Sequence, residues 1–211
     1  MIAPSTEGSE ATVWAASTGV TLTFDFARSG RADVRVARIF NTYGPNMDPD
    51  DGRVVSNVIC QALSGNPITI YGDGSQTRSF CYVTDTAEAL RRLMEVDEND
   101  LEPVNIGNPR ELTVRELVDL VVKMMGRPAE VRNAPLPVDD PRRRKPNIDR
   151  AKALLGWEPT TELEAGIQAT MNWFAKELGE DVLVTATVDD LDRHRRKRPA
   201  TSDIVREAAT G

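Results

Sequence analysis

The stretch VRVARIF, residues 34–40, decides the fold class of this chain. Its β-branched and aromatic side chains, bounded by Asp33 and Asn41, predict a strand. Residues 41–53 then contain two glycines and two prolines, which predicts an irregular loop. Because a loop of that length after a strand often carries functional residues, we expect binding side chains in it.

Downstream of this loop, helical and strand patterns alternate along the chain. Apolar residues spaced at i, i+3 and i+4 predict a helix over residues 54–63 that ends before Gly65. Thr113 and Glu116 form a capping-box pattern ahead of a helix that ends at Gly126. Similar signals predict a helix end at residues 22–28, helices at residues 85–94, 149–155 and 163–178, and strands at residues 68–71, 79–83 and 104–107. This alternation predicts an α/β fold.

The chain divides into three parts by composition. Residues 1–20 are small and polar without a sustained period, so we expect a weakly ordered start. Residues 21–178 carry the alternating pattern and have the length of one domain. Residues 179–211 are rich in charge, and we expect a mostly flexible tail there.

Charge and hydropathy exclude several classes of partner. The formal net charge is −7, so the overall field repels nucleic-acid phosphates and anionic lipid. The basic run at residues 193–198 adjoins aspartates and contains no aromatic residues, so we expect no nucleic-acid binding. No segment approaches the roughly 18 apolar residues of a membrane span. The start resembles no signal peptide, and we expect a cytoplasmic protein without a membrane partner.

Several side chains have structural interpretations. Cys60 and Cys81 lie in apolar stretches without metal-ligand spacing, so we expect reduced packing residues and no metal site. Thr84 or Asp85 is the expected N-cap of the helix over residues 85–94. Trp157 is expected in the core.

Basic side chains beside loops suggest an anion site. Arg53, Arg78 and the run at residues 142–144 lie in or next to loops, and planar guanidinium groups match phosphoryl oxygens bidentately. Taken alone, each arginine is more readily explained as a solvated surface charge.

Four strings of sequence change that balance. They are RVARIFNTYGP at residues 35–45, DGRVVSN at 51–57, PITIYGDGSQTRSFCYVTD at 67–85, and RRKPNIDRAKALLGWEP at 143–159. In order and spacing they resemble the extended short-chain dehydrogenase/reductases, and within these the UDP-glucuronate decarboxylases. The resemblance covers about residues 21–178. It implies the carboxy-terminal part of such an enzyme, with an incomplete Rossmann sheet and a small UDP-sugar-binding subdomain.

The resemblance also implies site residues. Those expected to bind a UDP-sugar are Asn41, Asn57, Thr69, Tyr71, Arg78 and Arg144, and those expected to bind NAD are Thr42 and Arg53. The two substrate arginines would clamp the diphosphate, and the strand at residues 68–71 would pass the uracil. Plainer interpretations stay open: Asn41 starts a turn, Ser56 or Asn57 caps a helix, and residues 68–71 form an edge strand.

The sequence departs from the family where the chemistry is expected. The 211 residues contain no GxxGxxG turn for a dinucleotide pyrophosphate. The resemblance puts the family's tyrosine–lysine proton-transfer pair at Thr12 and Ala16, neither of which can do that work, so we predict no catalytic residue. Asn147 stands where an aspartate is expected, and Phe26 where a tyrosine often faces the substrate.

Two functions follow from these departures. In the complete family the resemblance implies NAD-dependent conversion of UDP-glucuronate to UDP-xylose. This chain is then a truncated relative with weak or no activity that retains part of the UDP-sugar site and does not hold NAD alone. The alternative is a noncatalytic interaction module that forms a homodimer, or a heterodimer with an intact homologue, through the helix at residues 22–27.

Overall fold

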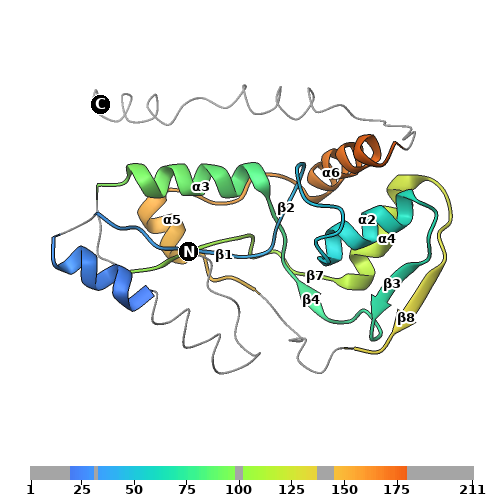
Figure 1. Cartoon of the computed structure of the whole chain (residues 1–211), viewed down its shortest axis with the longest axis horizontal. Coiled ribbons are helices and arrows are strands. Elements are labelled where there is room, and N and C mark those ends of the chain that lie inside the picture. The colour runs from blue at the N-terminus through green and yellow to red at the C-terminus, as the bar shows by residue number, and fades with distance from the viewer. Residues whose placement is uncertain (1–19, 31–32, 98–101, 137–144, 180–211) are drawn as a thin grey trace, which may run out of the picture.

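The computed structural model describes residues 20–30, 33–97, 102–136 and 145–179 (Figure 1). Residues 20–28 are helical. The other helices are α2 (Val54–Leu63), α3 (Val83–Glu95), α4 (Val114–Met125), α5 (Asp149–Leu155) and α6 (Leu163–Leu178). The weakly ordered start expected up to residue 20 and the tail expected from residue 179 fall almost wholly outside the described residues.

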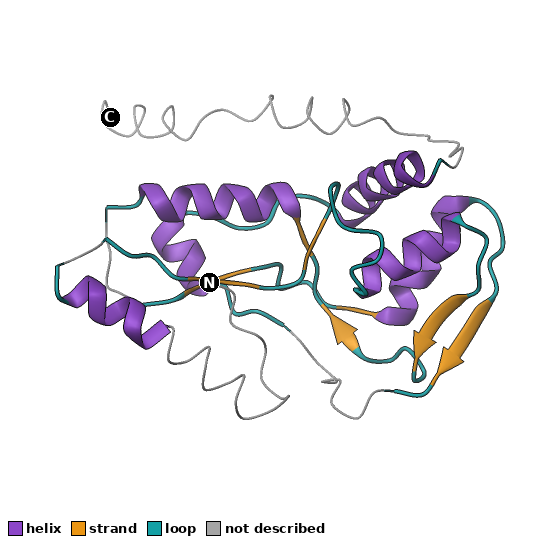
Figure 2. Ribbon diagram, in the orientation of Figure 1, coloured by secondary structure: helices purple, strands orange, loops and turns teal. Residues whose placement is uncertain are grey.

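The strands are short and form four pairs (Figure 2). The parallel pairs are β1 (Ala37–Ile39) with β6 (Val104–Ile106), β2 (Thr42–Tyr43) with β5 (Cys81–Tyr82), and β3 (Ile68–Tyr71) with β8 (Val131–Ala134). The antiparallel pair is β4 (Thr77–Arg78) with β7 (Leu112–Thr113). Each parallel pair joins strands that are separated in sequence by at least one helix, which confirms the predicted α/β class.

Two hydrophobic cores divide the described chain. In Figure 1, α2, α4 and α6 lie with β3 and β8 in one half, and α3 and α5 lie with β1 in the other. The first core contains Tyr43, Ile59, Ile68, Leu117, Ile167 and Phe174, and the second contains Cys81, Ala89, Val104, Ile106, Leu155 and Trp157. The strand β5 contributes to both cores, because Cys81 faces the second and Tyr82 faces the first. Alternate residues of a strand point to opposite sides, which explains this division.

The predicted capping of α4 and the predicted bounds of three other helices are confirmed. The Thr113 hydroxyl accepts from the Glu116 backbone N–H at 3.1 Å, and Glu116 Oε2 accepts from the Thr113 N–H at 2.6 Å. Gly126 then ends α4 in the left-handed conformation, with φ at 65°. The predicted helices at residues 54–63, 149–155 and 163–178 have the bounds of α2, α5 and α6.

The predicted N-cap of α3 is wrong. The helix begins at Val83, immediately after β5, and Tyr82 occupies the cap position without a side-chain hydrogen bond. Asp85 lies in the first turn, where its carboxylate accepts from Thr160 and Thr161. Its tertiary partners therefore replace the local backbone donors that an N-cap would take.

The predicted strands also proved too long. The expected strand at residues 34–40 is reduced to Ala37–Ile39, and only Cys81–Tyr82 of residues 79–83 is paired in β5. A strand extends only as far as it is hydrogen-bonded to a neighbouring strand. The partner of β1 is β6, which is only three residues long. None of the helices in the described ranges combines the length and the apolar character needed to cross a bilayer.

Candidate functional site

A cavity of about 290 Å³ opens between the loop after β1 and the start of α4. Its walls come from residues 41–58, which run from the end of β1 through β2 and its loop into α2, from residues 69–80, which run from β3 through β4, and from Val114 at the start of α4. The lining residues are Asn41, Thr42, Met47, Gly52, Arg53, Val54, Val55, Asn57, Val58, Thr69, Tyr71, Gln76, Arg78, Phe80 and Val114. The lining combines apolar side chains with eight polar ones, and a concave site that mixes apolar walls with polar groups suits a small molecule.

Seven of the eight residues predicted to bind substrate or cofactor line this one cavity. They are Asn41, Thr42, Arg53, Asn57, Thr69, Tyr71 and Arg78. The eighth, Arg144, lies outside the described residues. Residues selected from separate strings thus form a single wall, although their individual binding roles remain predictions.

Arg78 is the buried cation of the site. Only 7% of its surface is exposed, and it lies on β4, whose pairing with β7 fixes the backbone. Its guanidinium Nη1 donates to the Thr77 carbonyl at 2.8 Å. A buried guanidinium in a cavity wall favours an anionic ligand, because the low local dielectric strengthens the attraction.

Arg53 is the exposed cation, and it begins α2. Its backbone N–H donates to Asp51 Oδ1 at 2.9 Å, and its Nε lies 3.4 Å from Asp51 Oδ2. Its Nη1 also reaches the Thr42 carbonyl at 3.5 Å. The positive end of the helix dipole and the guanidinium therefore lie together at one end of the cavity, an arrangement that favours phosphate.

Neither Ser56 nor Asn57 caps α2, so that plainer interpretation is wrong. The N-cap position is Arg53, without a side-chain hydrogen bond. The Ser56 hydroxyl contacts Asp51 and the Arg53 carbonyl, and the Asn57 amide donates to the Gly52 carbonyl at 3.2 Å. The Asn57 amide therefore helps to shape the loop that borders the cavity.

Asn41 and Thr42 line the cavity beside β2, and hydrogen bonds hold both residues in place. The Thr42 hydroxyl donates to the Phe40 carbonyl at 3.0 Å and lies 3.1 Å from the Thr86 hydroxyl. The Asn41 carbonyl accepts from the Cys81 N–H at 2.9 Å, which leaves the Asn41 side chain at the cavity wall. The β2–β5 pairing thus sets the position of both residues.

Three further lining residues, Thr69, Tyr71 and Gln76, carry groups suited to a planar ring. Tyr71, at the end of β3, is 46% exposed, and the Thr69 N–H donates to the Gln61 side chain at 2.8 Å. Gln76 was not predicted as a site residue, although it lines the cavity and donates to the Tyr71 carbonyl at 2.9 Å. The only sequence signal for it was its place inside the string at residues 67–85.

The described cysteines and the core tyrosine do not supply a reactive group. Burial raises the pKa of the Cys60 and Cys81 thiols to about 11, which keeps both protonated near neutral pH. Burial also raises the pKa of Tyr43, whose hydroxyl donates to the Leu163 carbonyl at 3.4 Å. No cluster of metal-type ligands occurs within the described ranges.

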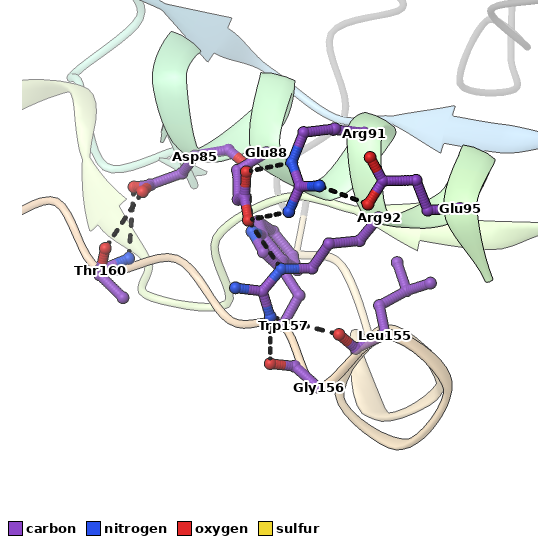
Figure 3. A network of polar contacts seen from close by, with 9 residues as sticks. All are labelled: Asp85, Glu88, Arg91, Arg92, Glu95, Leu155, Gly156, Trp157 and Thr160. Carbon is purple, nitrogen blue, oxygen red and sulfur yellow. Dashed lines mark hydrogen bonds and ion pairs between the residues drawn. The ribbon is translucent and has the colours of Figure 1, made fainter. Parts of the chain in front are cut away.

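A second polar network lies away from the cavity and supports the fold (Figure 3). Glu88 accepts from Arg91 and Arg92 on α3, and Arg92 donates to the Leu155 and Gly156 carbonyls at 3.2 and 2.6 Å. Trp157 is buried in the second core, and its indole N–H donates to the Asp85 carbonyl at 3.0 Å. The expected packing role of this tryptophan is confirmed.

Comparison with known sequences gives a consistent result. Residues 17–107 match the NAD dependent epimerase/dehydratase family. The chain is 50% identical over 159 residues to UDP-glucuronic acid decarboxylase 6 of Arabidopsis thaliana, covering 75% of this chain and 46% of the relative. It is 47% identical over 158 residues to UDP-glucuronic acid decarboxylase 1 of Xenopus tropicalis, covering 75% and 37%. The chain therefore spans less than half the length of these relatives.

Solved structures show the same fold. The UDP-glucuronic acid 4-epimerase of Bacillus cereus, in complex with UDP-glucuronic acid and NAD, has a TM-score of 0.72 at 26% identity, covering 82% of this chain and 57% of that one. The UDP-glucose 4-epimerase of Thermotoga maritima, with UDP-glucose, has a TM-score of 0.74 at 33% identity, covering 79% and 54%. The predicted family resemblance and fold class are confirmed.

Proposed function

Since this chain belongs, over residues 17–107, to the NAD-dependent epimerase/dehydratase family, we propose that its cavity binds a UDP-sugar, with UDP-glucuronate as the preferred ligand. The observation that carries the proposal is that seven residues, named from three separate strings of sequence, line one cavity. The decarboxylase relatives are named for UDP-glucuronic acid, and the two epimerase structures contain UDP-sugars.

The chemistry of the walls supports a nucleotide diphosphate. Arg53 and Arg78 supply positive charge, and the N-terminus of α2 adds backbone donors beside Arg53. Apolar side chains of Val55, Val58 and Phe80 cover the rest of the wall, so each phosphate contact would be partly shielded from water. In this assignment Arg144 is the second diphosphate clamp.

We further propose that this chain has little or no decarboxylase activity by itself. The cavity lining contains no aspartate, glutamate, histidine or lysine among the described residues. The positions expected to hold the proton-transfer pair are Thr12 and Ala16 in the sequence. A threonine hydroxyl is too weak an acid to replace a phenol, and alanine carries no charge to tune it.

The described residues do not fit an NAD site on their own. Thr42 and Arg53 could contact the cofactor, yet a dinucleotide pyrophosphate needs a glycine turn between a strand and a helix. The helices α3 and α4 follow β5 and β7 directly, with no such turn between them. We therefore derive no redox step through NAD for this chain.

Calorimetric titration of the purified chain with UDP, UDP-glucuronate and NAD tests the proposal. We expect both uridine ligands to bind and NAD not to bind. Arg78→Ala should weaken UDP binding at least tenfold, because it removes a charge-assisted contact. Arg132→Ala is the matched control, since Arg132 is exposed and pairs with Glu130 on β8. Tight NAD binding, or no uridine binding at all, would contradict the proposal.

One observation favours the interaction module as a second candidate. Leu22 and Phe26 are four residues apart on the helix at residues 20–28, and they are 55% and 52% exposed. Residues at i and i+4 share a helix face, so the two form an apolar patch. Sedimentation of the chain with and without an intact UDP-glucuronate decarboxylase tests this role. A faster-sedimenting complex that Leu22→Asp abolishes would support it, and unchanged sedimentation would exclude it.

A further inference from the structure

We propose that Gln76 selects uracil over cytosine in this cavity, by accepting a hydrogen bond from the N3–H of the base. The inference rests on the proposed UDP-sugar function and adds the residue that distinguishes the pyrimidine. Gln76 lines the cavity together with Thr69 and Tyr71, and its side chain is bonded to the Tyr71 carbonyl.

The backbone around Gln76 is held firmly. Its carbonyl accepts from the Val114 N–H at 3.1 Å, and the Gly74 carbonyl accepts from the Arg115 N–H at 3.1 Å. Both bonds attach the turn after β3 to the first residues of α4. Gly74 has φ at 80°, and an added Cβ there would lie 3.3 Å from the Arg115 backbone nitrogen. The turn therefore packs closely on α4 and presents Gln76 from a fixed position.

The orientation of the Gln76 amide is fixed as well. Its Nε2 donates to the Tyr71 carbonyl at 2.9 Å. Rotating the amide by half a turn would bring Oε1 against that carbonyl, and two acceptor oxygens at hydrogen-bond distance repel each other. Gln76 therefore keeps its nitrogen toward Tyr71 and its oxygen available. Within the part of the chain that the structure describes, no protein donor is bonded to Oε1.

A fixed acceptor distinguishes the two pyrimidines at ring position 3. Uracil carries a hydrogen on N3 and can donate it to Oε1. Cytosine has a lone pair at N3, which would face the amide oxygen without a hydrogen between them. An amide free to rotate would accommodate both bases, whereas one held by the Tyr71 carbonyl accommodates only the donor. A site built around a hydrogen bond discriminates strongly because the mismatched ligand leaves polar groups unpaired.

The position of Gln76 relative to Arg78 suits one nucleotide. Gln76 directly precedes β4 and Arg78 is the second residue of that strand, so the two are separated by one position. Both line the cavity. A base held at Gln76 would thus direct its diphosphate toward the Arg78 guanidinium.

Titration of the full chain with UDP, CDP and the N3-methyl analogue of UDP tests the inference. We expect UDP to bind at least tenfold more tightly than either of the other two ligands. Gln76→Met, which keeps the length of the side chain and removes its polar end, should weaken UDP binding about fivefold to tenfold and bring the three affinities within about twofold. Gln168→Met is the matched control, because Gln168 bonds to Asn172 on α6 and does not line the cavity. It should keep the preference of the unmodified chain.

The outcomes separate this inference from the proposed function. If UDP binds and CDP binds equally well, or if Gln76→Met keeps the preference for UDP, the role of Gln76 is wrong and the UDP-sugar site stands. If UDP does not bind at all, the proposed function fails first. The comparison of UDP with its N3-methyl analogue needs only the unmodified chain, and equal binding of the two would overturn the inference even if Gln76→Met does not fold.

Discussion

Glu88 on α3 shows how a single carboxylate responds to its neighbours. Hydrogen bonds from Arg91 and then Arg92 hold the pKa of Glu88 at about 2, below its ordinary value of 4.5. Arg92 in turn donates to the carbonyls that end α5. The carboxylate therefore orients the arginine that joins α3 to α5.

We predict that this ion-paired group makes stability depend on pH in the acid range. Its folded-state pKa is depressed, so its contribution is fully present above the unfolded value and is lost as pH falls from about 5 toward 2. Glu88→Gln should lower the free energy of unfolding by about 1 to 2 kcal/mol at pH 7, after allowing for solvent screening.

Urea midpoints at pH 7, 5, 4 and 3 test this prediction. The difference between the unmodified chain and Glu88→Gln should be nearly the same at pH 7 and pH 5 and should shrink at pH 4 and again at pH 3. Asp25→Asn is the control, because Asp25 pairs with Arg28 on an exposed surface and should cost little at any pH. A difference that stays constant down to pH 3 would show that the arginines do not depress this pKa in solution.

Among the secondary-structure elements, α6 can pack as it does only because residue 166 is a glycine, without a side chain. Gly166 lies in its first turn, packed against the Tyr43 ring of β2. A Cβ added at Gly166 would lie 2.2 Å from Tyr43 Oη and 3.0 Å from Tyr82 Cδ2. Helix propensity and tertiary packing therefore oppose each other at this position.

We predict that Gly166→Ala destabilises the protein by about 1 to 3 kcal/mol, as overpacking of a core does. Helix propensity alone predicts the opposite effect, an increase of about 1 kcal/mol in the free energy of unfolding. Tyr43→Phe removes the nearest clashing atom, so the double variant should recover part of the loss. The measurement is urea unfolding of both single variants and the double variant, and a more stable Gly166→Ala chain would show that α6 can move away from β2.

At the scale of the molecule, Asp85 links the two cores. Its side chain is 5% exposed and accepts from the Thr161 N–H at 2.9 Å and from the Thr160 hydroxyl at 3.2 Å. These threonines lie in the connection from α5, which packs in the second core, to α6, which packs in the first. The connection is thereby fastened to the first turn of α3.

We predict that Asp85 keeps the unfolding of the two cores cooperative. In a chain carrying Trp14→Phe and Trp173→Phe, the remaining Trp157 reports on the second core, and far-UV circular dichroism reports on the helices as a whole. Both signals should share one urea midpoint. Adding Asp85→Ala should cost about 2 to 4 kcal/mol, because it leaves buried donors unpaired, and should lower the Trp157 midpoint below the dichroism midpoint. Coincident midpoints in the Asp85→Ala chain would rule out this linking role.

Much of the candidate site was accessible from the sequence because its residues stand in contiguous strings. Asn41, Thr42 and Arg53 belong to one loop, and Thr69, Tyr71 and Arg78 to one strand–turn–strand segment. Gln76 lies in that same segment, but its significance depends on the Tyr71 carbonyl that orients its amide. No spacing rule predicts such a contact, because the geometry of the turn decides it.

The sequence by itself determined the α/β class, the bounds of α2, α5 and α6, and the capping of α4. Each of these depends on contacts within one or two helical turns: apolar periodicity, a glycine C-cap, or a threonine–glutamate pair. Only the tertiary structure decided the two-residue strands β2, β4, β5 and β7, the early start of α3, and the gathering of residues 41–58, residues 69–80 and Val114 around one cavity. Those features arise from hydrogen bonds and packing between residues far apart in the chain, for which the local pattern carries no signal.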